Sequence, residues 1–402
     1  MFKRQRITMV AAVTSLLALT LAACGEDGTD AEAGGARGVT DSEIKIGGIL
    51  DLSGPYNVAG VDMKDGMQAY ADWVNENGGV NGREISMVYE DNKSDPGATA
   101  AAANKLVLRD EVFAIAGVHG AAAFGAIFDL VDREGVISLS LGLSESMYNP
   151  VRPNVFVAAV PYAQQMGRTV EYAAEEFGAD MRLATLTQDD EFGTSGLDGI
   201  TTTAEELGVE IVGQETFTRG AADVTAQTRA LLSEDPEVIA CMCIYTQTGQ
   251  LRKELNDQGA SDVAILAPNP SIGAPYFELA GADSGGMYAA DYYSHPDGPG
   301  WSEAQEIFAA SFDRDPTGFN LFGLVNMAVL VEAIEAADGD LTTDAVRSAL
   351  EAMNGVEIPG MVGPVTFSAD SHVASQETIV YEADPATKAF VQVGDAGVPP
   401  GY

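Results

Sequence analysis

Cationic residues, cysteine and histidine are all scarce in this chain. Its 402 residues include 21 Lys and Arg against 60 Asp and Glu, together with three Cys and three His. Such an acidic surface repels the phosphates of nucleic acid and of anionic membranes, so neither is expected as a partner. His119, His295 and His372 lie far from one another and from the cysteines in the sequence. No metal-ligand spacing occurs, and we predict no metal site.

The motifs of common enzyme chemistry are also missing. There is no phosphate-binding Gly-x-x-x-x-Gly-Lys-Ser/Thr loop, and no Gly-x-Gly-x-x-Gly follows the first apolar strand. Ser195 lies in a Gly-Thr-Ser-Gly sequence that lacks the nucleophile elbow. Asp189, Asp190 and Glu191 form a carboxylate cluster, but such a run more often caps the helix that follows than performs acid–base chemistry. We therefore expect no catalytic residue, no cofactor and no enzyme activity.

The N-terminus has the pattern of a secretory leader. Three basic residues within the first six precede an apolar run at 7–19, which is short for a membrane span. Leu21-Ala-Ala-Cys24 follows and resembles the bacterial lipobox, whose thiol receives a lipid. We expect residues 1–23 to be removed as a lipoprotein signal peptide and Cys24 to carry the lipid. A plain secretory signal with an unrelated cysteine is the alternative.

The segment after the leader is predicted to be a disordered tether. Residues 24–41 are rich in Gly and acidic residues and have almost nothing to bury. Removal of the leader leaves 18 Lys and Arg against 60 Asp and Glu, a net charge of −42. The protein is thus expected on the extracellular face of the cell membrane, held there through its lipid only.

From residue 42 onwards, short apolar strands alternate with helical stretches, which predicts an α/β fold with largely parallel sheets. Asp95 and Pro96 predict one helix start, as an N-cap and a first-turn proline. Cys241 and Cys243 lie in the apolar run 238–244, which is typical of a buried strand. On an extended strand their side chains share one face, so we expect two small core residues rather than a disulfide.

The alternation restarts after an extended segment at 154–161, which predicts two lobes with a cleft between them. Each lobe is expected to be built from two segments, because the chain continues far beyond the second unit. The predicted N-terminal lobe comprises 42–157 and 288–367, and the C-terminal lobe 158–287 and 368–402.

Three segments carry a family resemblance in the first half of the chain: residues 44–55 (IKIGGILDLSGP), 75–83 (NENGGVNGR) and 90–96 (EDNKSDP). Together with residues 189–193 (DDEFG) and 279–287 (LAGADSGGM), they resemble the Leu/Ile/Val-type substrate-binding proteins of ABC transporters. The resemblance runs from about residue 44 to 367. It implies a type I periplasmic-binding fold, in which two Rossmann-like lobes joined by three crossings close on a small-molecule ligand.

The resemblance also implies partners and a ligand site. The partners are the permease and ATPase subunits of an importer, and the binding protein is expected to be a monomer. Ala121 and Ala122 stand where the family commonly has serines, Phe192 matches the aromatic residue that closes over the ligand, and Ile244 or Tyr245 forms a second wall. The ligand-binding candidates are Tyr56, His119, Ala121, Ala122, Gly142, Ser144, Phe192, Tyr245 and Asn269.

Two departures from the family bear on the ligand. Ala121 lacks a hydroxyl, and Asn269 stands where the family has the acid that receives the ligand's ammonium. A buried ammonium without a carboxylate is costly, which argues against a zwitterion unless Asp51, Asp291 or Glu191 substitutes. The ligand is left open between an amino acid, an amide or urea, and an apolar or aromatic carboxylate. The first alternative function is a lipid-anchored sensor of the same fold that works without a permease. The weakest alternative is an extracellular hydrolase.

Overall fold

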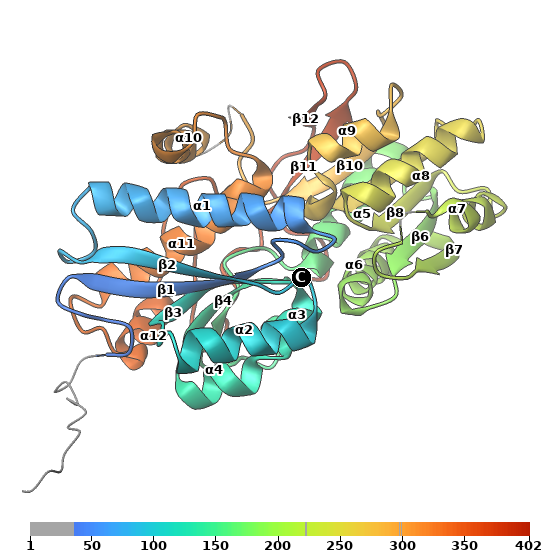
Figure 1. The fold of residues 1–402 in the computed structure, drawn as a ribbon. Helices are drawn as coiled ribbons and strands as arrows, with labels where there is room; N and C mark the ends of the chain where they lie inside the picture. Colours follow the sequence, from blue (N-terminus) through green and yellow to red (C-terminus); the bar gives the residue numbers. More distant parts are fainter. Residues whose placement is uncertain (1–35, 222, 297, 299) are drawn as a thin grey trace, which may run out of the picture. The chain divides into compact units, whose positions relative to one another are not determined.

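In the described chain, strands alternate with helices from residue 43 to 291, as predicted, and three helices and two strands follow (Figure 1). The computed structural model describes residues 36–221, 223–296, 298 and 300–402. The predicted leader at 1–23, the lipidation site Cys24 and the first part of the tether lie outside the described residues. The predicted α/β class is confirmed by two sheets with helices packed against them.

The first sheet has five parallel strands in the order β2-β1-β3-β4-β5, which is a doubly wound arrangement. The strands are β1 (Glu43–Leu50), β2 (Glu84–Asp91), β3 (Ala114–His119), β4 (Ile137–Leu141) and β5 (Val155–Phe156). The connecting helices are α1 (Asn57–Glu76), α2 (Pro96–Leu108), α3 (Ala121–Gly125) and α4 (Phe128–Glu134). Asp95 caps α2 by accepting a hydrogen bond from the N–H of Ala98, as the sequence predicted.

The second sheet has the order β12-β11-β10-β9-β8-β6-β7. Its parallel strands are β6 (Arg182–Gln188), β7 (Glu210–Phe217), β8 (Val238–Met242), β9 (Ala264–Pro268) and β10 (Met287–Asp291), and β11 (Ile379–Asp384) and β12 (Ala389–Gln392) are antiparallel. Its helices are α5 (Tyr162–Phe177), α6 (Glu191–Leu207), α7 (Thr225–Leu232), α8 (Tyr245–Asp257) and α9 (Ala274–Ala280).

The chain returns to the first sheet after β10 and then comes back to the second. The returning helices include α10 (Trp301–Ser311), α11 (Gly318–Ala336) and α12 (Thr343–Glu351), after which β11 and β12 join the second sheet. Strand β10 pairs with β9 as far as Ala290 and with β11 as far as Asp291. The chain therefore belongs to the second sheet as far as Asp291. The lobe boundary predicted at residue 288 stays a prediction.

Helix α11 is long and apolar enough to cross a membrane by composition, but 78% of its most apolar window is buried inside the protein. Asn326 in its middle donates hydrogen bonds to the carbonyl oxygens of Ala116 (3.1 Å) and Ser140 (3.2 Å). Those residues lie on β3 and β4, so α11 is tied to the first sheet as a core helix.

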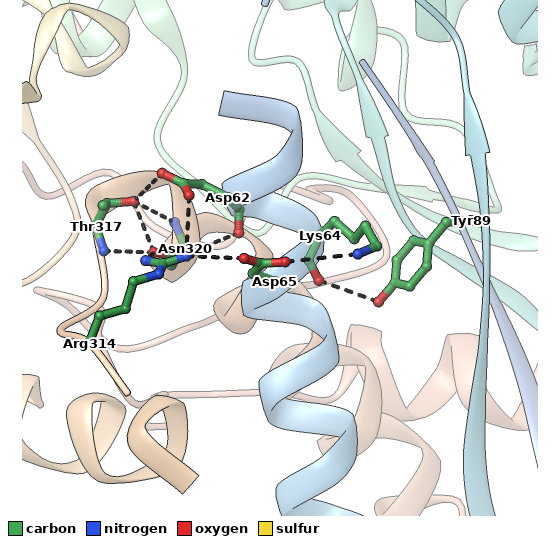
Figure 2. A network of polar contacts seen from close by, with 7 residues as sticks. All are labelled: Asp62, Lys64, Asp65, Tyr89, Arg314, Thr317 and Asn320. Carbon is green, nitrogen blue, oxygen red and sulfur yellow. Dashed lines mark hydrogen bonds and ion pairs between the residues drawn. The ribbon is translucent and has the colours of Figure 1, made fainter. Parts of the chain in front are cut away.

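Polar contacts join the start of α11 to α1 (Figure 2). Thr317 caps α11 in a capping box with Asn320, and its hydroxyl donates to Asp62 at 2.9 Å. The Asn320 amide donates to the carbonyl oxygen of Asp62 at 2.7 Å. Arg314 bridges both helices, donating to the Asn320 side chain at 2.7 Å and to Asp65 at 3.0 Å. A half-buried network of this kind fixes the register of two helices that lie far apart in sequence.

The expectation for the cysteine pair is wrong, since the structure contains a disulfide between Cys241 and Cys243. Strand β8 ends at Met242, and the N–H of Cys243 donates to the carbonyl oxygen of Cys241 at 2.9 Å. This three-residue turn brings the two Cα atoms to 5.2 Å, within the range that a disulfide requires. The prediction failed because it extended the strand through residue 244, where the backbone in fact turns.

Candidate functional site

The carboxyl ends of strands from both sheets surround one cavity, with an empty space, including its mouth, of about 690 Å³. Loops at strand ends commonly hold ligands in doubly wound folds. The residues that line it from the first sheet, its helices and loops and α11 are Tyr56, Ala59, Met63, Ser94, His119, Gly120, Ala121, Leu141, Phe319 and Phe322. Those from the second sheet, its helices and loops are Tyr162, Gln188, Phe192, Arg219, Ile244, Tyr245, Asn269 and Pro270.

Most of the residues predicted from the sequence meet at this cavity. Those that line it are Tyr56, His119, Ala121, Phe192, Tyr245 and Asn269. The remaining three, Ala122, Gly142 and Ser144, are not among the lining residues. Gly142 packs behind the lining, because a Cβ atom there would lie 2.6 Å from the Ala121 nitrogen. The buried Ser144 hydroxyl donates to the carbonyl oxygen of Glu191 at 3.4 Å. The direct contact with ligand expected for these three residues stays a prediction.

Aromatic rings form much of the cavity wall. Phe192 and Tyr162 meet edge to face with their ring centroids 4.8 Å apart, and Tyr245 lies 6.4 Å from Phe319 of α11. Both members of the first pair are buried. Burial raises the pKa of the Tyr162 hydroxyl, which therefore stays neutral at physiological pH. The wall thus offers flat apolar surface, with phenolic hydroxyls as its polar groups.

Asp190 positions Phe192, because it caps the helix on which Phe192 lies. Its Oδ1 accepts hydrogen bonds from the backbone N–H groups of Phe192 (3.1 Å) and Gly193 (3.3 Å). The capping role predicted for the acidic cluster is confirmed at this residue. The same carboxylate also forms an ion pair with Arg219, whose Nε donates to Oδ2 at 2.9 Å. One acid therefore orients an aromatic wall and a cation at the same cavity.

Arg219 was missed in the sequence analysis. It lies two residues after the end of β7, as Asp190 lies two residues after the end of the adjacent strand β6. Neighbouring parallel strands end at the same edge of a sheet. The adjacency of β6 and β7 therefore brings the side chains of Asp190 and Arg219 together. The available signal was the position of a scarce cation just after a predicted strand.

His119 and Asn269 present buried polar atoms that lack hydrogen-bond partners among the described residues. These atoms are His119 Nδ1 and Asn269 Oδ1. Burial lowers the pKa of His119 to about 4, with Asp51 opposing the shift and Arg219 adding to it. The imidazole is therefore neutral at pH 7, and its Nδ1 can donate a hydrogen bond to a ligand or accept one from it, depending on the tautomer.

The carboxylates that could have substituted for the missing acid do not line the cavity. Asp51 accepts hydrogen bonds from the backbone N–H groups of Gly54 and Tyr56, just before α1, and from Ser94 Oγ at 2.7 Å. Asp291 accepts from His295 at 3.0 Å and from three further donors, and Glu191 accepts from Ser146. Each is engaged in holding protein structure.

No cluster of three or more His, Cys, Asp or Glu suited to a metal ion occurs within 36–221, 223–296, 298 and 300–402.

A sequence profile of the periplasmic binding protein family matches residues 43–389. The Leu/Ile/Val-binding protein BraC3 of Rhizobium johnstonii is 26% identical over 346 residues, which cover 85% of this chain and 92% of the relative.

Two solved structures share the fold. The fatty acid ABC transporter substrate-binding protein from Thermomonospora curvata has a TM-score of 0.81 at 22% identity, covering 91% of this chain and 96% of its own. The branched-chain amino acid ABC transporter protein from Thermus thermophilus, solved with bound valine, has a TM-score of 0.80 at 20% identity, covering 90% and 98%. The chain therefore belongs to the periplasmic binding protein family, with the type I fold and the Leu/Ile/Val-type resemblance that its sequence indicated.

Proposed function

We propose that this protein is the extracellular substrate-binding component of an ABC importer, anchored through a lipid on Cys24. The observation that carries the proposal is the cavity itself, which is lined by strand ends of both sheets and by aromatic rings. A site of this composition suits a small organic ligand. The names of the similar proteins, which include Leu/Ile/Val-binding and fatty acid transporter proteins, support a transport role.

The two sheets, each with its helices, would act as lobes that close over the ligand. Residues 42–157 and 292–367 would form the N-terminal lobe, and 158–291 and 368–402 the C-terminal lobe. Closure removes water from the aromatic walls and strengthens the hydrogen bonds inside the cavity. The permease and ATPase subunits would receive the ligand from the closed form, and the binding protein would act as a monomer.

A thermal-shift panel tests the binding function. Mature protein is heated with branched-chain and aromatic amino acids, with short aliphatic and aromatic carboxylic acids, and with the matching amides. A ligand at 100 times its Kd stabilises the folded state by about 2.7 kcal/mol, which raises Tm by several degrees. A flat panel, with no compound raising Tm even at millimolar concentration, would count against the proposal.

Phe192→Ala is expected to weaken binding of the best panel compound by about 2 kcal/mol, because an apolar wall of the cavity is lost. Isothermal titration measures the change in Kd on folded protein, which separates it from any loss of stability. Phe177→Ala serves as the control, since Phe177 lies at the end of α5 and is 42% exposed. Equal affinity of the Phe192 variant and the wild type would place the ligand elsewhere.

A further inference from the structure

Arg219 is the one residue with a charged side chain among the described residues that line the cavity. It lies in the turn after β7, and 34% of its side chain is exposed. His119 does not add to the charge at neutral pH, since burial lowers its pKa to about 4. The electrostatic character of the cavity thus depends on the pair that Arg219 makes with Asp190.

The Asp190 carboxylate has no acceptor capacity left for a ligand. Oδ1 accepts from the N–H groups of Phe192 and Gly193, and Oδ2 accepts from Gln188 at 2.7 Å and from two nitrogens of Arg219. Five donors exceed the roughly four lone-pair positions that a carboxylate offers. A ligand ammonium would therefore find Asp190 fully occupied.

The guanidinium, in contrast, keeps donors to spare. An arginine has about five N–H groups in a planar fork, and two nitrogens, Nε and Nη2, are engaged with Asp190. Nη1 and the second hydrogen of Nη2 have no acceptor in this pair. They form a face that suits the two oxygens of a ligand carboxylate.

The other polar atoms of the cavity are neutral. Asn269 Oδ1 and His119 Nδ1, which lack hydrogen-bond partners within the described part of the chain, can bond a hydroxyl or an amide. Neither supplies the negative charge that a buried ammonium requires. The aromatic rings and Met63 provide apolar surface for a hydrocarbon body. Charge and shape therefore favour an anion with an apolar tail over a zwitterion.

We propose that Arg219 binds the carboxylate of the ligand, and that the ligand is an aliphatic or aromatic acid without an ammonium group. This inference rests on the binding function proposed above and narrows its substrate class. Asp190 is then a positioning residue, which orients the guanidinium and Phe192 together.

The test uses compounds that differ by one group. Leucine is compared with 4-methylpentanoate, its analogue without the ammonium, and with 4-methylpentanamide, which lacks both charges. Phenylalanine, 3-phenylpropanoate and 3-phenylpropanamide form a second set. We expect at least one of the two acids to bind about tenfold or more tightly than its amino acid and its amide, as measured by isothermal titration at pH 7.

Variants then assign the effect to Arg219. Arg219→Gln is expected to weaken binding of the acid on the order of 10- to 100-fold and to leave the affinity for the amide nearly unchanged, because only the charged hydrogen bonds are lost. Arg219→Lys should recover part of the affinity, since the charge returns without the planar fork. Arg229→Gln is the matched control, because Arg229 is 60% exposed on α7 and its loss changes the net charge equally.

The outcomes separate this inference from the binding function. Tighter binding of leucine or phenylalanine than of the corresponding acids would overturn the inference and leave the binding function in place. An Arg219→Gln variant with unchanged affinity for the acid would do the same. If no compound of either set or of the wider panel binds, both the inference and the binding function are overturned.

Discussion

Gly66→Ala is expected to destabilise the protein by about 3 kcal/mol or more, because helices α1 and α11 cross in backbone contact at this point. A Cβ atom at Gly66 would lie 1.8 Å from the carbonyl oxygen of Asn320. At Gly323 on the other helix, a Cβ atom would lie 1.9 Å from the carbonyl oxygen of Met63. Neither obstacle is a flexible side chain, so the helices must move apart. The gain in helix propensity, about 1 kcal/mol, does not compensate for this separation.

Urea unfolding of the wild type, Gly66→Ala and Gly323→Ala measures the effect as a change in midpoint. Gly318→Ala is the matched control, because Gly318 starts α11 and a Cβ atom there would meet nothing within 4 Å. The control should be as stable as the wild type or slightly more stable. If Gly66→Ala had the same urea midpoint as the control, the inference that the two helices cross in backbone contact would be wrong.

The crossing also matters for the cavity. Helix α11 carries Phe319 and Phe322, which line the cavity, while α1 carries Ala59 and Met63. The polar network around Asn320 and Asp62 links these two helices (Figure 2). A substitution that separates the helices should thus disturb binding as well as stability.

Much of the fold follows from local chemistry that the sequence displays. Asp95 and Pro96 predict the start of α2 because one side chain caps free N–H groups and the other lacks an N–H. The position of His119 at the end of β3 and that of Phe192 at the start of α6 follow from the βα alternation, since the loops at one edge of a parallel sheet converge. Most of the nine candidates were identified through the family resemblance, and six of the nine line the cavity.

The missed residues depend on contacts between distant segments. Phe319 and Phe322 reach the cavity on a helix that returns to the first sheet after the second is built, and no local pattern reveals its partner. The pairing of Arg219 with Asp190 requires the order of β6 and β7. The disulfide of Cys241 depends on where β8 ends, which apolar composition alone did not locate.

His119 should make the protein acid-sensitive over a defined range. Burial lowers its pKa to about 4 in the folded state, whereas an exposed histidine titrates near 6.5. Above pH 6.5 both states are neutral at this residue. As the pH falls from 6.5 to 4, the unfolded chain takes up a proton that the folded protein does not, so unfolding becomes more favourable. The shift corresponds to about 3 kcal/mol of stability lost across this range.

His119→Gln isolates this contribution, since glutamine keeps a polar side chain but does not titrate. Urea unfolding of both proteins at pH 7, 5.5 and 4.5 measures the difference in unfolding free energy between them. The carboxylates are common to both proteins, and their effect on the pH dependence therefore largely cancels in the difference. The wild type should lose stability relative to the variant as the pH falls. Parallel pH profiles would mean that His119 accepts a proton equally well in the folded and unfolded states, contrary to the burial that lowers its pKa in the folded protein.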